Sequence, residues 1–243
     1  MSMLSEADDI EIVDIDDTCY TLIPSRFPPI DLFERIANDD EGAAVARIET
    51  ITNPRLRDRQ RALQTEAVDV TAPRYQNWNH APFTYRNPEG SRYFGPESAV
   101  LELADDLQTA LAISVRKRET FLSRTDEART NLDMRVLSRK VTGRFADLRH
   151  LDPNLDRDAR IAVGRRIADI TTPIDGLLYN PPERPSAKCF AILNAGALAR
   201  AVQGDHFRFV WDGKCIRSLY SFSGPGLIID PQGLASAEWV LAA

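Results

Sequence analysis

The chain has 243 residues, 43% hydrophobic and 27% charged, which is typical of a soluble globular protein with one large domain or two small ones. Its formal net charge of −6 gives no general reason to expect binding to nucleic acid or to an anionic membrane surface. No apolar stretch approaches the roughly 18 residues that a membrane-spanning helix needs. We therefore expect no membrane and no direct nucleic-acid partner.

The N-terminal sequence and the cysteines favour a cytoplasmic protein. Residues 1–14 are acidic and lack the basic and apolar regions of a signal peptide. The three cysteines, Cys19, Cys189 and Cys215, form no CxxC pair, which suits reduced thiols. Neither they nor the three histidines show metal-ligand spacing, so we expect no metal. We also expect residues 1–9 to be a flexible N-terminus and 10–243 to form one domain.

In the first half of the chain, the pattern predicts one strand, two short helices and a loop. Residues 10–15 alternate in polarity, which predicts a strand. Short helices are expected at 31–37 and 42–51, the second ending before Pro54, which disfavours helix in the residue that precedes it. Three prolines and two glycines in residues 81–98 predict a loop.

The second half predicts two longer helices among short strands. A helix is expected at 106–122, capped by Asp105 or Asp106, because a mostly apolar stripe recurs every 3.6 residues. That stripe comprises Leu107, Ala110, Leu111, Ser114, Val115, Arg118 and Phe121. Another is expected at 157–170, capped by Asp156. Predicted strands cover 134–141, 144–148, 175–179 and 187–194, and Asp212-Gly213 between alternating runs indicates a hairpin with a type I′ turn. Helices do not alternate regularly with these strands, so we predict an α+β fold with mixed or antiparallel sheets.

The segment Asp14-Ile-Asp-Asp-Thr18 follows an apolar run and has the DxDxT spacing of haloacid-dehalogenase-like phosphatases. In those enzymes the first Asp attacks phosphorus, the second protonates the leaving oxygen, and both help to bind magnesium. A phosphatase that uses Asp14 and Asp16 is therefore one hypothesis. It lacks clear partners elsewhere in the chain, and an acidic turn after an edge strand explains the same residues.

From Tyr20 onward, the chain carries an ordered series of segments that spans roughly 200 residues. They are YTLIPSRFPPI (20–30), IETITNPRLRD (48–58), FTYRNPEGSRYF (83–94), TALAISVRKRETFL (109–122), DMRVLSRKVTG (133–143), DGLLYNPPERPSAKCFAIL (175–193) and VWDGKCI (210–216). In this order they resemble the RES domain family, which is named for an Arg, a Glu and a Ser. The resemblance implies an ADP-ribosyltransferase-like fold, with NAD as substrate or ligand. It also implies a toxin of a bacterial toxin–antitoxin pair, with an antitoxin-like protein or a second copy of the chain as partner.

NAD chemistry explains which residues such a site needs. Breaking the nicotinamide–ribose bond develops positive charge on the ribose, which a nearby carboxylate stabilises. An Arg binds the pyrophosphate through forked hydrogen bonds, and a His one helical turn from the acid manages protons.

The resemblance keeps one of these groups and replaces the others. Arg92 matches the family's loop Arg. Ile113 stands at the position of the acid and Lys117 at that of the His. Pro181 replaces the Ser and Glu183 the Arg after it. In addition, Thr21 stands where the family has an Arg in its opening segment, and Leu101-Glu102 where it has a Tyr pair.

Several alternatives remain open for these positions. Glu102 could supply a carboxylate from another direction, or it could be a solvent-facing strand residue. A shifted alignment would make Glu119 the acid. Arg92 could contact the ligand or only brace its loop, and Tyr179 ends a strand where a pocket could open. The expected site thus comprises Arg92 and Glu102 as catalytic candidates, with Arg92, Tyr179 and Lys117 as NAD-binding candidates.

These substitutions suggest a pseudoenzyme: a RES-family protein with a substituted NAD site, weak or absent catalysis and a role in protein binding. An active NAD-degrading or ADP-ribosylating toxin with rearranged groups is the first alternative, and the phosphatase is the second.

Overall fold

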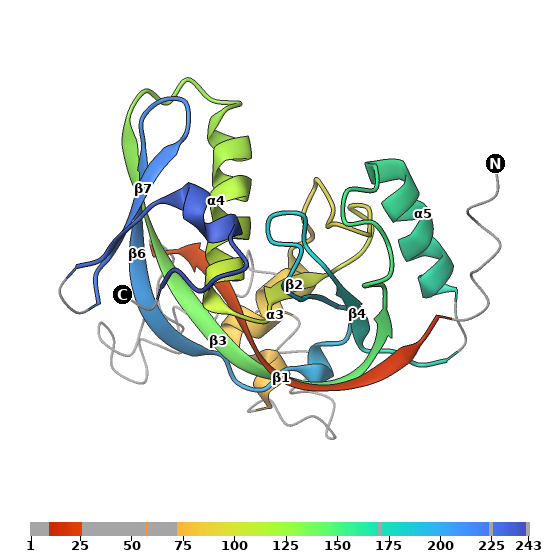
Figure 1. Cartoon of the computed structure of the whole chain (residues 1–243). Coiled ribbons are helices and arrows are strands. Elements are labelled where there is room, and N and C mark those ends of the chain that lie inside the picture. The colour runs from red at the N-terminus through yellow and green to blue at the C-terminus, as the bar shows by residue number, and fades with distance from the viewer. Residues whose placement is uncertain (1–9, 26–56, 58–71, 170–171, 224–225, 242–243) are drawn as a thin grey trace, which may run out of the picture.

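The computed structural model describes residues 10–25, 57, 72–169, 172–223 and 226–241 (Figure 1). The helices predicted at 31–37 and 42–51 and the expected flexible N-terminus, residues 1–9, lie outside the described residues. The described strands are β1 (Ile12–Pro24), β2 (Leu101–Ala104), β3 (Thr130–Asp147), β4 (Gly176–Tyr179), β5 (Cys189–Ile192), β6 (Val202–Trp211), β7 (Ile216–Ser221) and β8 (Ile228–Ile229). The α-helices are α3 (Asn77–Thr84), α4 (Leu107–Leu122) and α5 (Arg157–Ala168), with short 3-10 turns at Pro73–Tyr75, Ala195–Ala197 and Pro231–Ala235. This is a mixed α+β fold, as predicted.

The strands form one mixed sheet around the long strand β3. The order is β1-β2-β5-β4-β3-β6-β7-β8, and β1 also pairs with β3, so the pairings of β1 to β5 form a closed ring. Near its start β3 pairs antiparallel with β6, and near its end it pairs parallel with β4. Because β3 spans both regions, it ties the ring of short strands to the β6–β7 hairpin.

Strand β1 is longer than predicted, and its length contradicts the phosphatase hypothesis. It continues through the acidic segment, pairing with β3 from Ile12↔Ala146 to Pro24↔Met134. Asp14 and Asp16 lie on its exposed side, where Asp16 pairs with Lys140 at 2.9 Å. A DxDxT nucleophile must follow a strand in a loop, whereas here the motif lies inside a strand. The phosphatase reading was therefore wrong.

The two long helices begin where the sequence predicts. Asp106 caps α4 by accepting a hydrogen bond from the Thr109 amide at 2.7 Å, and Asp156 caps α5 by accepting one from Ala159 at 2.8 Å. The predicted apolar face of α4 is largely buried, with Leu111 fully so. Phe121 is an exception, because it lies in the last turn and is 60% exposed.

Two local predictions were wrong. Residues 81–84 are the end of helix α3, which tolerates Pro82 inside it, rather than part of a loop. The β6–β7 connection is a four-residue loop rather than a two-residue type I′ turn. Its first residue, Asp212, accepts hydrogen bonds from the amides of Lys214 and Cys215, and Gly213 takes a positive φ of 101°.

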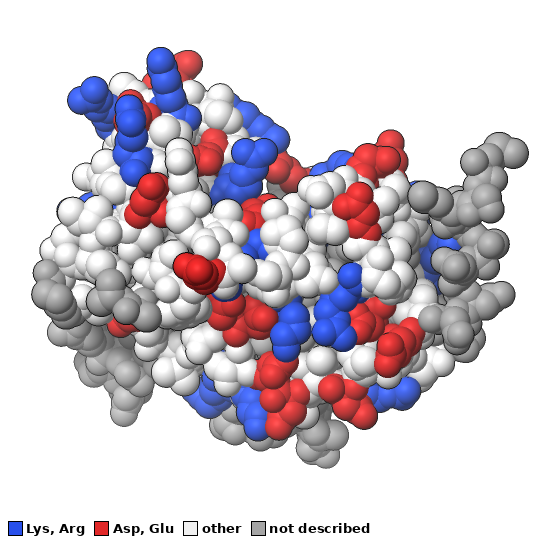
Figure 2. Space-filling view, in the orientation of Figure 1, with Lys and Arg blue, Asp and Glu red and all other residues white. Residues whose placement is uncertain are grey.

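Helices α4 and α5 stand on opposite sides of a hollow in the molecule. Figure 1 shows α4 beside β3 and the β6–β7 hairpin, and α5 on the other arm, beyond β4. The outline of the space-filling view dips between them, and basic and acidic side chains gather there (Figure 2). Within the described part of the chain, no helix is long and apolar enough to cross a membrane.

Candidate functional site

A cleft of about 590 Å³ opens in this hollow. Five segments contribute to it: the loop 87–92, strand β2, the outer face of α4, the first turn of α5, and the end of β4 with the residues after it. Its volume is within the range of pockets that hold small molecules and nucleotide cofactors.

The positions singled out by the resemblance come together in this cleft. Arg92, Ile113, Lys117 and Pro181 all line it, although they are spread over 90 residues of sequence. Ile113 and Lys117 are one turn apart on α4, so both face the cleft, as the family's acid and His are expected to do. The segment alignment is thus consistent with the fold, and the position of the acid holds an aliphatic side chain.

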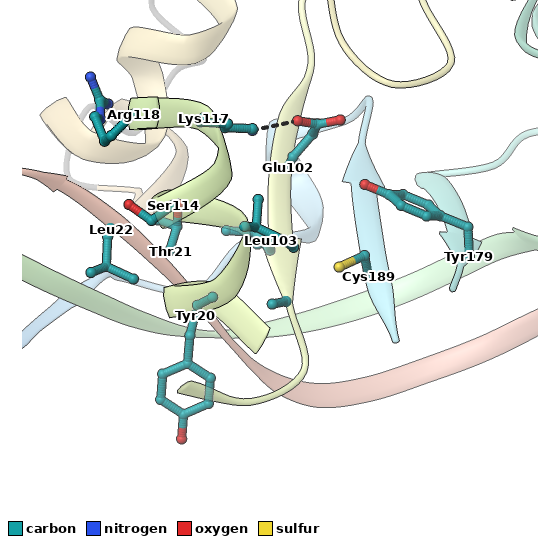
Figure 3. A pocket seen from close by; sticks show the side chains of 13 residues that line it. Tyr20, Thr21, Leu22, Glu102, Leu103, Ser114, Lys117, Arg118, Tyr179 and Cys189 are labelled. Atoms are coloured by element: carbon teal, nitrogen blue, oxygen red, sulfur yellow. Dashed lines mark hydrogen bonds and ion pairs between the residues drawn. The ribbon is translucent and has the colours of Figure 1, made fainter. Parts of the chain in front are cut away.

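Glu102 also lines the cleft, and it is held by two partners. Its Oε2 lies 2.7 Å from Lys117 Nζ (Figure 3). Its Oε1 accepts a hydrogen bond from the Arg92 amide at 2.9 Å. The Glu102 side chain is 18% exposed and that of Lys117 57%. Burial raises the pKa of Glu102, but the attraction of Lys117 and the hydrogen bonds to its carboxylate outweigh burial and hold the pKa below its ordinary value of 4.5. The same carboxylate raises the pKa of Lys117.

Arg92 connects the loop 87–92 to the floor of the cleft. Its Nη2 donates to the Pro153 carbonyl, while its guanidinium carbon lies 5.6 Å from the centre of the Tyr179 ring. Its Nε is buried and has no hydrogen-bond partner among the described residues. Arg92 therefore holds its loop against the segment before α5 and also lines the cleft, where it is available to a ligand. Glu89, which could have paired with it, pairs with Arg124 instead.

Tyr179 forms part of the floor of the cleft. It is 3% exposed, and its ring meets that of Tyr93 edge to face with centroids 5.2 Å apart. Burial, followed by the negative charge of Glu102, raises the pKa of the Tyr179 hydroxyl well above 10.0. The hydroxyl therefore stays protonated at neutral pH and can donate a hydrogen bond.

A smaller pocket of about 170 Å³ adjoins the cleft. It extends to Thr21 on β1, and it shares five residues with the cleft: Glu102, Ile113, Lys117, Arg118 and Tyr179. Position 21 of the opening segment is thus close to the other site positions, as the resemblance implies. Figure 3 shows Lys117 reaching from α4 across to Glu102 on β2.

Glu119 does not belong to this site. Its Oε1 accepts a hydrogen bond from the Ile216 amide at 2.9 Å, which ties α4 to the start of β7. Because Glu119 lines neither the cleft nor the adjoining pocket, the shifted alignment that would make it the acid is wrong.

The cleft is positively charged although the chain as a whole is acidic. Seven basic and three acidic side chains, a formal balance of +4, stand among the described residues that line it. The basic side chains are Arg92, Arg116, Lys117, Arg118, Arg124, Arg157 and Arg160, and the acidic ones are Glu89, Glu102 and Glu183. Such a surface attracts anionic ligands.

Sequence reasoning named only Arg92 and Lys117 of these seven cations as site residues, and Arg157 and Arg160 are among the five that it missed. These two belong to the first turn of α5 and reach back to the loop 87–92: Arg157 Nη2 donates to the Glu89 carbonyl at 2.6 Å, and Arg160 Nε to the Arg92 carbonyl at 3.1 Å. No sequence motif includes Arg157 or Arg160, and both are more than 60 residues from the loop 87–92 in sequence. The arrangement of Arg92, Arg157 and Arg160 can bind an anion, and Glu102 can stabilise a nearby positive charge.

Comparison with known proteins agrees with this geometry. The family model described as RES domain matches residues 66–212, which include both long helices and the residues of the cleft. The chain is also 47% identical over 226 residues to a protein of Sinorhizobium fredii (strain NBRC 101917 / NGR234) described as "Uncharacterized protein y4oC"; the alignment covers 93% of this chain and 96% of that protein. With a family match over more than half of its length and the family's site positions gathered in one cleft, the chain belongs to the RES domain family.

Proposed function

We propose that this RES-family protein binds an NAD-type dinucleotide in its cleft, has little or no catalytic activity on it, and acts through protein binding. The observation that carries the proposal is the shared location of Arg92, Ile113, Lys117 and Pro181. These are the positions where the family resemblance implies Arg, acid, His and Ser, and only the Arg is retained.

The residues suit one end of the dinucleotide better than the other. Arg92, beside Arg157 and Arg160, offers forked donors to a pyrophosphate. Cleavage of the nicotinamide–ribose bond also needs a carboxylate against the developing positive charge. Ile113, which stands at the position of the acid, has an aliphatic side chain and cannot supply this carboxylate. A retained Arg92 together with a replaced acid favours binding over turnover.

Calorimetric titration with NAD tests the binding. We expect binding by the wild type, loss of about tenfold or more in affinity for Arg92→Ala, and unchanged affinity for Arg166→Gln. Arg166→Gln is a matched control because it removes the same charge at an exposed position of α5 that does not line the cleft. If the wild type fails to bind NAD at millimolar concentration, the proposal is wrong.

An active enzyme with rearranged groups is a second candidate, and the position of Glu102 favours it. This carboxylate faces the cleft between Lys117 and the Arg92 amide, so it could take over the electrostatic role of the replaced acid. The candidate predicts that the wild type releases nicotinamide from NAD and that Glu102→Gln abolishes the release while the protein stays folded. Equal release by both proteins would remove it.

Protein binding is the remaining part of the proposal. Family membership suggests an antitoxin-like partner, and a second copy of the chain is the simplest alternative. Light scattering after size exclusion distinguishes a monomer from a self-associated form. Co-expression with the products of neighbouring genes, followed by copurification, tests for a separate partner. A monomer without a copurifying partner and without toxicity on expression would contradict this part.

A further inference from the structure

Arg92, Arg157 and Arg160 all line the cleft, and Arg160 is close enough to the other two for their charges to act on it. We call this set the guanidinium cluster. Each guanidinium donates to a main-chain carbonyl: Pro153 for Arg92, Glu89 for Arg157, and both Leu155 and Arg92 for Arg160. The side chains are therefore held in place by the backbone of the loop 87–92 and of the segment before α5.

These carbonyl bonds fix the guanidinium groups without neutralising them. No ion pair among the described residues includes a member of the cluster. Of the carboxylates that line the cleft, Glu89 pairs with Arg124 and Glu102 pairs with Lys117. Burial, followed by the positive charge of Arg92 and then that of Arg157, lowers the pKa of Arg160 against the opposing effects of Tyr93 and Asp156, so Arg160 is near enough to both other guanidinium groups to be repelled by them.

An anion between these groups would relieve the repulsion and use donors that are already oriented. Fixed cations that require no reordering lose little entropy on binding. A diphosphate fits this arrangement better than a carboxylate, because it spreads several charges over oxygens that can each accept from a different guanidinium.

We propose that the guanidinium cluster is a diphosphate site and that the cleft prefers ADP-ribose and nucleoside diphosphates to NAD. The preference follows from charge. NAD carries a cationic nicotinamide ring that cancels part of its phosphate charge, and this ring would enter a cleft with a formal balance of +4. ADP-ribose lacks that cation, and ADP carries a further negative charge.

The identity of residues 113 and 117 supports the same preference. Where the resemblance implies a carboxylate that would favour a cationic ring, the cleft has Ile113, and Lys117 adds a positive charge one turn away. Glu102 is the carboxylate closest to Lys117, and their ion pair offsets its charge. The nicotinamide ring of NAD thus lacks a carboxylate at position 113, whereas the diphosphate still meets the guanidinium cluster.

This inference rests on the proposed function only in placing the ligand in the same cleft. It is tested by calorimetric titration of the wild type with four probes in turn: NAD, ADP-ribose, ADP and inorganic pyrophosphate. We expect ADP-ribose and ADP to bind about fivefold or more tightly than NAD, and binding to weaken as ionic strength rises. Arg157→Gln and Arg160→Gln should each weaken ADP binding about tenfold, whereas Arg166→Gln should not.

The outcomes separate the two proposals. If NAD binds as tightly as ADP-ribose, or if Arg157→Gln and Arg160→Gln bind ADP like the wild type, the inference is overturned and the proposed function stands. If pyrophosphate binds but none of the three nucleotides does, the proposed function falls together with the preference for ADP-ribose and ADP, and the guanidinium cluster is only a site for small anions.

Thermal stability distinguishes a binding role from a structural one. Arg157 is exposed, and its removal relieves repulsion, so Arg157→Gln should melt within about 2 °C of the wild type and lose the stabilisation that ADP confers. A variant that melts well below the wild type and keeps its affinity for ADP would show that Arg157 serves only to hold the loop 87–92.

Discussion

Lys117 Nζ on α4 lies 2.7 Å from Glu102 Oε2 on β2, so the cation at the family's His position pairs with a carboxylate that enters from the sheet. Both residues line the cleft together with Ile113 and the guanidinium cluster. The Glu102 carboxylate also acts on Tyr179, because its negative charge helps to raise the pKa of the Tyr179 hydroxyl.

The ion pair predicts a pH-dependent contribution to stability. The pKa of Glu102 lies below 4.5 in the folded protein, so its contribution is present above the unfolded value and is lost as the pH falls through the folded value. Glu102→Gln should therefore lower the free energy of unfolding by more at pH 7 than at pH 3. The loss at pH 7 should be only about 1 kcal/mol, because Lys117 is largely exposed to solvent. Urea denaturation of both proteins at the two pH values measures this. A difference that stays constant with pH would contradict it.

The loop that carries Arg92 depends on Gly90. This residue has a φ of +74°, and a Cβ there would lie 2.4 Å from the Phe94 carbonyl oxygen. Gly90→Ala should lower the free energy of unfolding by about 1–3 kcal/mol and weaken ligand binding, because the loop positions Arg92. Gly204→Ala is the control: its Cβ would meet only ordinary contacts at 3.7 Å or more. Equal stability of the two variants in urea denaturation would count against the loop's role.

Gln108 fastens the C-terminal segment onto α4. The side chain is fully buried; its Nε2 donates to the carbonyls of Leu234, Ser236 and Glu238, and its Oε1 accepts from the Val240 amide at 2.9 Å. Gln108→Leu leaves these main-chain groups without their partner and should cost about 2–4 kcal/mol. Hydrogen exchange should rise at residues 234–240, with the cleft unaffected. Unchanged exchange there would contradict the assignment.

Local signals in the sequence were enough for several features of the fold and the site. The caps Asp106 and Asp156 marked both long helices correctly, because an N-cap depends on residues only three positions apart. The segments aligned with the family also predicted that Arg92 and Ile113 lie in one cleft. This worked because each residue keeps its position within its own segment, and the fold brings those segments together.

Features that depend on distant partners could not be predicted. The acidic segment at Asp14 looked like the end of a strand, but β3 supplies Lys140 and Thr142 opposite Asp16 and lets the strand continue. In the same way, nothing in the sequence of α5 shows that Arg157 and Arg160 turn toward the loop 87–92, since their carbonyl partners are set by tertiary packing.

Release of nicotinamide from NAD tests the central claim most directly. Wild type and Arg92→Ala, at equal concentration, are incubated with excess NAD, and free nicotinamide is separated by chromatography and quantified over hours. Binding without turnover predicts that the two proteins release nicotinamide at the same rate, equal to that of NAD in buffer. Sustained release by the wild type that is abolished in Arg92→Ala would contradict the claim and identify an active enzyme.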